Sequence, residues 1–203
     1  MNSFYVPKKL LITGCQRSGT TLLATALARH SEVSMLWGDL QGKINLLIGK
    51  KYAGVKLSAY RQIRERRATK LDHLLNRIIS LFRNKNRYRV FPTNSMCFDD
   101  FDKIIYIDRE PPGKVTESIE RNLGLSFWLA TDEWSKAYDI KRYLDNSEIF
   151  DLYFVRFEKL VNNPEEELRK ICVWLDLEWD EKMLEAPKYN HEYPQKEWDR
   201  SRI

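Results

Sequence analysis

Short apolar runs alternate along the chain with longer segments in which apolar residues recur at helical spacing. Four runs have the length and composition of buried strands, and they lie at 9–13, 32–37, 103–107 and 152–155. Helical spacing extends over four segments, at 20–30, 71–82, 115–123 and 127–144. A further helix is expected after Asn163, which can cap it, because Pro164 suits the first helical position.

Strands that alternate with helices predict an α/β fold, in which helices flank a central, mainly parallel sheet. The chain has 203 residues, of which 43% are hydrophobic, and this length and composition suit one globular domain. We therefore expect a single three-layer domain over residues 1–203.

The cysteines and the apolar runs indicate the cellular compartment. Cys15, Cys97 and Cys172 are widely spaced, so they form neither a disulfide framework nor a zinc-binding pattern. No apolar run approaches the ~20 residues that a membrane span requires. The first residues also lack the pattern of a signal peptide. We therefore expect a soluble, cytoplasmic protein without a membrane span.

Positive charge is concentrated in the middle of the chain. Thirteen basic and two acidic residues lie from Lys50 to Arg89, so this segment carries +11, whereas the whole chain carries +5. We interpret the part around 56–90 as a basic helical insertion. A charged helix is most often a solvated surface, and the alternative is a segment that faces an anionic partner.

The segment most informative about function runs from Gly14 to Leu23, with the sequence GCQRSGTTLL. It follows a predicted strand and opens a predicted helix. Glycines allow a turn in which several backbone N–H groups point at one anion, and the helix N-terminus adds partial positive charge. Arg17 contributes a full charge, and Thr20 and Thr21 can contribute hydroxyl donors. The segment therefore predicts a phosphate-binding loop in a P-loop-like fold.

The position of the basic residue indicates which anion this loop binds. A loop for nucleoside triphosphates has lysine directly after its second glycine, where this chain has Thr20. Residues 17–23 (RSGTTLL) instead resemble the 5′-phosphosulfate loop of the sulfotransferases that use 3′-phosphoadenosine 5′-phosphosulfate (PAPS). They are most similar to the branch of the tyrosylprotein sulfotransferases and many bacterial members. The resemblance implies that the donor is bound by Arg17, Ser18, Gly19, Thr20 and Thr21.

Two later segments support the resemblance. The first is similar to the family's 3′-phosphate motif, in which an arginine follows a strand, here Arg109, and the next helix bears a serine, here Ser118. The family serine usually lies one residue earlier, where this chain has Glu117, so we interpret the intervening loop as one residue longer. The second, 155–164, resembles the family's Arg-Tyr-Glu-Asp-Leu stretch, and Phe157 replaces the tyrosine and keeps only a ring contact to the nucleotide.

The resemblance implies sulfuryl transfer from PAPS to a hydroxyl or amine, with the desulfated nucleotide PAP as the product. Arg17 would stabilise the charge that builds on the leaving 5′-phosphate. An acidic residue shortly after the first helix is the base in this branch, and Asp39 is the candidate. Lys56 is the candidate for a lysine near the sulfuryl group, and His30 is interpreted as structural. No cluster of His, Cys and carboxylates has metal-binding spacing, so no metal is expected.

The acceptor is left open among carbohydrates, lipids, peptides and small molecules, because one fold serves many substrates. The basic segment would favour an anionic acceptor. Two other functions stay open. A small P-loop kinase would hold magnesium on Asp108, although the loop lysine is missing. A non-catalytic module would bind an anion through the basic helix, although no recognised nucleic-acid motif is present and nucleic acid is not the expected partner.

Overall fold

The structure is a computed structural model that describes residues 6–36, 50–82, 96–190 and 197–198. Five parallel strands form one sheet in the order β2-β3-β1-β4-β5. The strands are β1 (Lys8–Gly14), β2 (Val33–Leu36), β3 (Tyr52–Lys56), β4 (Lys103–Asp108) and β5 (Leu152–Arg156). Because all five strands run the same way, their carboxyl ends meet at one edge of the sheet, where open α/β proteins bind ligands.

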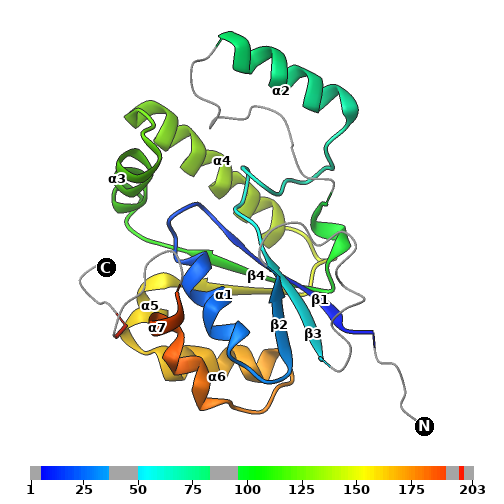
Figure 1. The fold of residues 1–203 in the computed structure, drawn as a ribbon, viewed down its shortest axis with the longest axis vertical. Helices are drawn as coiled ribbons and strands as arrows, with labels where there is room; N and C mark the ends of the chain where they lie inside the picture. The colour runs from blue at the N-terminus through cyan, green and yellow to red at the C-terminus, as the bar shows by residue number, and fades with distance from the viewer. Residues whose placement is uncertain (1–5, 37–49, 83–95, 191–196, 199–203) are drawn as a thin grey trace.

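Helices cover both faces of this sheet (Figure 1). One face is covered by α1 (Thr20–Ala28), α5 (Phe157–Asn162), α6 (Pro164–Trp174), the 3-10 turn η3 (Glu181–Glu185) and α7 (Ala186–Tyr189). The other face is covered by the 3-10 turn η2 (Phe98–Asp100), α3 (Pro112–Leu123) and α4 (Phe127–Asp145). The predicted three-layer fold with a parallel central sheet is thereby confirmed.

The central strands β1 and β4 are apolar over most of their length because both faces of the sheet are buried there. Leu10 and Ile12 of β1 pack with the layer of α1, whereas Leu11 between them packs with the layer of α3 and α4. Ile105 of β4 likewise joins the first cluster, and Ile104 joins the second. This alternation explains why the buried strands appear in the sequence as continuous apolar runs.

The strand β3 was not predicted, although it pairs with both β1 and β2 in the middle of the sheet. Gly54 and the lysines at either end of the strand hide its apolar pattern. The glycine is required by packing, since a Cβ at Gly54 would lie 2.3 Å from the sulfur of Met35. Lys56, expected at the start of a basic insertion, instead ends this strand, and Leu57, Ala59 and Ile63 after it are buried in the core.

The predicted basic helix is present as α2 (Lys70–Phe82), which lies beyond the carboxyl edge of the sheet, at the top of Figure 1. Thr69 caps it: Asp72 accepts bonds from the Thr69 backbone N–H and hydroxyl, each 2.8 Å, and its own N–H donates to the Thr69 hydroxyl. The Arg66 guanidinium donates two further bonds to Asp72 and lowers the pKa of that carboxyl. Leu71 and Leu74 on the apolar side of the helix are exposed.

The other predicted helices are confirmed, with one difference at a cap. Gly124 ends α3 in the left-handed conformation, at φ 62°, as expected for a helix-terminating glycine. Pro164 occupies the first turn of α6, but the Asn163 side chain makes no capping hydrogen bond, because α5 runs directly into this junction. Among the described residues, no helix is both long and apolar enough to span a membrane.

Candidate active site

The predicted phosphate loop lies at the carboxyl edge of the sheet, between β1 and α1. Two glycines shape it. Gly14 has φ 155° and lies so close to β4 that a Cβ there would come 2.2 Å from the carbonyl oxygen of Ile107. Gly19 has φ 94°, in the left-handed region, and a Cβ on it would come 2.4 Å from the ring of Phe157. Both positions therefore require glycine for space, and Gly19 requires it for conformation as well.

The N-terminus of α1 leaves backbone groups for a ligand. Gly19 precedes the first turn, and no side chain caps the helix there. The first N–H groups of any α-helix lack partners within that helix, and the helix dipole makes this end partially positive. Thr20 and Thr21, both largely buried, form the first turn. The arrangement is that of an anion-binding helix start.

Ser18 has a structural position within the loop. Its side chain is fully buried, and its hydroxyl lies 2.6 Å from the carbonyl oxygen of Cys15 and 3.1 Å from that of Ile107. The hydroxyl therefore fastens the loop to β4, and any part of Ser18 in donor binding would run through the backbone. Burial also raises the pKa of the Cys15 thiol far above its usual range, which favours the protonated thiol.

Arg17 and Ser118, which are far apart in the sequence, meet beside this loop. The Arg17 Nε donates to the Ser118 Oγ at 3.2 Å, and the Asn122 amide also reaches that oxygen at 3.3 Å. Arg17 has φ 70°, a left-handed conformation that is uncommon outside glycine and is typical of functional loops. The contact joins Ser118 to Arg17, and the interpretation of a loop lengthened by one residue stays a prediction.

Arg109 follows β4 and is held on two sides. Its Nη1 donates to the backbone carbonyl of Arg17 at 3.0 Å, and its guanidinium carbon lies 4.7 Å from the centre of the Phe157 ring. The ring is buried and lies close to both Arg109 and Gly19. Phe157 therefore packs against both the loop and the arginine, and its expected ring contact with the nucleotide stays a prediction.

Asp108, the candidate magnesium ligand of a kinase, is engaged in other contacts. One of its carboxylate oxygens pairs with the Lys141 ammonium from α4, and the other accepts the backbone N–H of Arg109 at 2.9 Å. A lysine at this carboxylate opposes metal binding. In the described part of the chain, no group of three or more His, Cys, Asp or Glu side chains is arranged to hold a metal ion.

Lys56 and Arg61 lie on the β3 side of the phosphate loop, whereas Asp108 and Arg109 lie on its β4 side. Lys56 pairs in register with Ile12 of β1, two residues before the loop. Arg61 donates to the Gln16 side chain at 3.1 Å and lies 3.6 Å from a carboxylate oxygen of Glu133 on α4. Sequence reasoning missed Arg61, because it is one of thirteen basic residues in its segment and nothing local distinguishes it.

The remaining predicted residues are Asp39 and His30. Asp39 lies outside the described residues, shortly after the end of β2 at Leu36. His30 is buried, and its two ring nitrogens contact the Glu178 carbonyl at 2.8 Å and the Glu32 backbone N–H at 3.1 Å. Both nitrogens are therefore used in the fold, which agrees with the structural interpretation of this histidine.

Comparison with known proteins is consistent across sequence and fold. The model of the sulfotransferase family matches residues 77–181, which is more than half of the chain. A search among curated proteins finds no significant match.

Several solved structures share the fold at low sequence identity. The sulfotransferase domain from the curacin biosynthetic pathway has a TM-score of 0.63 and 16% identity, over 98% of this chain and 90% of that one. The sulfotransferase domain of the Synechococcus olefin synthase has a TM-score of 0.61 and 17% identity, over 99% of this chain and 90% of that one. A mouse sulfotransferase complexed with PAP has a TM-score of 0.54 and 14% identity, over 90% of this chain and 63% of that one.

Proposed function

Because the chain belongs to the sulfotransferase family, we propose that it transfers a sulfuryl group from PAPS to a hydroxyl or amine of an acceptor. The loop between β1 and α1 would bind the 5′-phosphosulfate, and Arg109 and Ser118 would bind the 3′-phosphate. The three cysteines of the chain are buried and unpaired with one another, which suits a reducing compartment, and we assign the activity to the cytoplasm.

The observation that carries the proposal is the contact of the loop with the second motif. Arg17 reaches Ser118, and Arg109 reaches the backbone of Arg17, so two guanidinium groups and an uncapped helix start lie at one edge of the sheet. Guanidinium groups can bind phosphate through two parallel hydrogen bonds. A nucleotide with phosphates at both its 5′ and 3′ positions matches two separate cationic groups of this kind.

Sulfuryl transfer forms one bond to sulfur and breaks another. The acceptor oxygen or nitrogen attacks sulfur, the bond between sulfur and the bridging phosphate oxygen breaks, and the acceptor proton passes to a base. Negative charge grows on the departing 5′-phosphate, where Arg17 and the first N–H groups of α1 would stabilise it. Stabilisation that increases toward the transition state raises turnover as well as affinity.

Asp39 and Lys56 complete the proposed machinery. Asp39 would accept the proton of the acceptor. Lys56 ends β3 beside the loop strand, at the edge where the sulfuryl group would lie. Its ammonium would reduce the repulsion between the attacking group and the sulfuryl oxygens.

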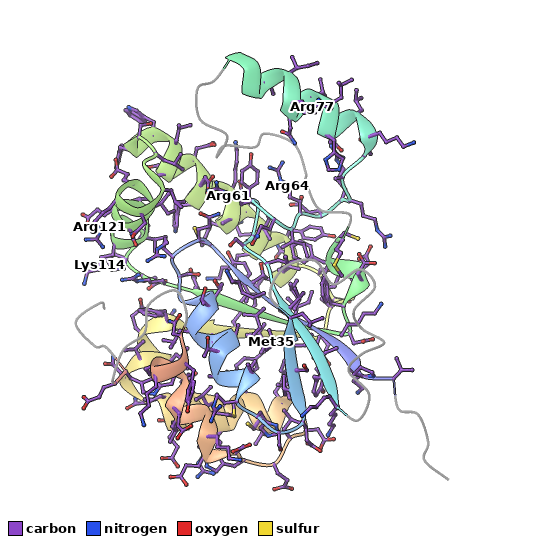
Figure 2. The ribbon with its side chains drawn as sticks, in the orientation of Figure 1. Met35, Arg61, Arg64, Arg77, Lys114 and Arg121 are labelled. Atoms are coloured by element: carbon purple, nitrogen blue, oxygen red, sulfur yellow. The ribbon has the colours of Figure 1, made fainter. Side chains whose placement is uncertain are left out.

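The acceptor is proposed to be anionic. Arg64 follows β3 and Arg77 lies on α2, and both lie at the end of the molecule where the carboxyl ends of the strands meet (Figure 2). Raising the salt concentration should then raise the KM for the acceptor, because screening weakens attraction between separated charges.

The direct test uses PAPS labelled in its sulfuryl group and a panel of carbohydrate, lipid, peptide and small-molecule acceptors, each offered with a neutral and an anionic form. We expect label on one acceptor class with the unmodified protein, and at least a tenfold lower rate with Arg17→Ala, which removes a charge that acts in the transition state. Equal labelling by the two proteins would contradict the role of the loop.

A further inference from the structure

The segment after β3 is fastened to the phosphate loop by its backbone. The N–H of Leu57 donates to the carbonyl of Ile12 at 3.0 Å, and the N–H of Ala59 donates to the carbonyl of Gly14 at 2.9 Å. Tyr60 then adopts φ 62°, which turns the chain sharply. Arg61 follows this turn, so the sheet determines the position of its backbone, even though it lies in a loop.

The Arg61 side chain is held over the loop by two groups from different elements. Its Nη1 donates to the Oε1 of Gln16, the residue before Arg17, and lies 3.6 Å from the Oε1 of Glu133. The Glu133 side chain is buried on the inner side of α4, where burial raises the pKa of its carboxyl. The nearby charges of Arg61, Arg64 and Lys136 lower that pKa, and Asp132 raises it.

A buried carboxylate is costly to a fold unless it is paired. An apolar or amide side chain at position 133 would avoid that cost, so the carboxylate is better explained by what it does to Arg61. The arrangement fixes a guanidinium that would otherwise sample many rotamers, and it directs this group to the loop. Preorganised charges of this kind are effective in catalysis because they need no rearrangement during the reaction.

The order of the strands places Arg61 and Arg109 on opposite sides of the loop. Arg109 follows β4, Arg61 follows β3, and β1 with its loop lies between them. A nucleotide with its 3′-phosphate at Arg109 and its 5′-phosphate in the loop would extend its next group toward β3. In PAPS that next group is the sulfuryl group.

We propose that Arg61 binds the sulfuryl group of the donor, and that Glu133 and Gln16 are positioning residues that hold Arg61 there. The inference rests on the proposed function, and it concerns the group that PAPS has and PAP lacks. During transfer the bond from sulfur to the bridging oxygen breaks, and its electron pair stays on the 5′-phosphate near Arg17. Arg61 would remain with the three outer sulfuryl oxygens while sulfur forms its bond to the acceptor.

The first test compares two nucleotides and needs no acceptor. Binding of PAPS and of PAP is measured by calorimetry for the unmodified protein and for Arg61→Ala. A charge-assisted hydrogen bond of this kind corresponds to about a tenfold to hundredfold change in affinity. We expect that loss for PAPS and less than about a twofold change for PAP, which lacks the sulfuryl group.

The matched control is Arg121→Ala, which removes the same charge from an exposed position on α3 (Figure 2). It should change the affinity of neither nucleotide. An equal loss of PAPS affinity in both variants would mean that general positive charge, and not a specific contact, attracts the donor. That result would overturn the proposal.

The positioning role of Glu133 is tested with Glu133→Gln, which keeps the shape of the side chain and removes its charge. We expect weaker PAPS binding and lower turnover, with PAP affinity and melting temperature maintained or increased. A purely structural role would instead lower the melting temperature and weaken the binding of both nucleotides together.

A rescue experiment tests the role of the Arg61 guanidinium itself. Guanidinium chloride at low concentration should partly restore the turnover of Arg61→Ala, and it should restore the turnover of Arg17→Ala to a smaller extent.

Different results would contradict the proposed function and the proposed role of Arg61. If the unmodified protein binds neither PAPS nor PAP, the proposed function is wrong. If it binds both and Arg61→Ala keeps the same ratio of PAPS to PAP affinity, only the inference about Arg61 is wrong. Should Arg61→Ala fail to fold, Arg61→Lys serves the same comparison, because lysine keeps the charge but cannot bond Gln16 and an oxyanion in the same geometry.

Discussion

The Arg109 guanidinium lies 3.0 Å from the backbone carbonyl oxygen of Arg17, so the arginine after β4 is bonded to the loop after β1. The Phe157 ring packs against both of these parts. The proposed 5′- and 3′-phosphate sites are therefore mechanically connected. A change in one is expected to affect the other, to a smaller degree.

The first prediction concerns nucleotide selectivity. Arg109→Ala should weaken PAP binding by about tenfold to a hundredfold, the usual effect of losing a charge-assisted hydrogen bond to phosphate. Binding of 5′-AMP, which has no 3′-phosphate, should fall much less, through the lost bond to the Arg17 carbonyl alone. Calorimetry with both nucleotides measures the difference.

Arg121→Ala is the control for this experiment, since Arg121 is an exposed arginine on the adjoining helix α3 (Figure 2). It should leave both affinities unchanged. An equal loss for PAP and AMP in Arg109→Ala would show that Arg109 supports the fold instead of recognising the 3′-phosphate.

The second prediction concerns the shape of the loop. Gly19→Ala should destabilise the protein by about 1–3 kcal/mol, because alanine disfavours the left-handed conformation and its Cβ would meet the Phe157 ring. Gly113→Ala is the matched control: nothing lies within 4 Å of a Cβ there, and alanine favours the helix α3. Thermal unfolding of the two variants should show a loss for the first only. Similar melting temperatures would contradict the described packing of the loop.

The third prediction concerns pH and Glu133. Burial raises the pKa of this carboxyl in the folded protein above its ordinary value of 4.5, so the folded state keeps its proton to a higher pH than the unfolded chain does. The stability contributed by this group therefore falls as the pH rises above about 4.5. Glutamine does not titrate, so Glu133→Gln should gain stability relative to the unmodified protein as the pH is raised.

Melting temperatures of both proteins between about pH 4 and pH 8 test this sign. If the melting temperature of Glu133→Gln instead falls relative to that of the unmodified protein as the pH rises, the ion pair with Arg61 outweighs the cost of burying the carboxylate.

The fourth prediction concerns the base. Asp39→Asn should lower turnover by about a hundredfold or more, the usual contribution of general base catalysis, and should leave PAP affinity unchanged. The measurement is the initial rate of sulfuryl transfer at saturating PAPS, together with PAP calorimetry. Full activity in this variant would place the base at another residue.

Much of the fold can be predicted from the sequence because the buried strands and the helix ends have local signals. The apolar runs of β1, β4 and β5, and Gly124 at the end of α3, are examples. The strand β3 could not be recognised, because its central position depends on a tertiary contact: Gly54 is there to accommodate the sulfur of Met35 in the neighbouring strand.

The residues of the candidate site also fall into two groups, those with a local sequence signal and those without one. Arg17 and Gly19 belong to a contiguous motif whose chemistry is local, so the sequence alone is enough to predict them as site residues. The network of Arg61, Gln16 and Glu133 joins residues from a loop, the phosphate loop and α4, and no spacing rule connects them. Such contacts are created by the topology of the sheet, and they become visible only when the chain is folded.

The measurement that tests the proposed function most directly is calorimetry of PAP binding in the presence of a metal chelator. The proposed phosphate loop has Thr20 at the position where nucleoside triphosphate loops have lysine, and its basic residue is Arg17. The Asp108 carboxylate that a magnesium ion would need is paired with Lys141. We predict that PAP binds without any metal, and that ATP with magnesium binds much more weakly. Tight binding of ATP with magnesium, together with no binding of PAP, would contradict the assignment of this site to PAPS.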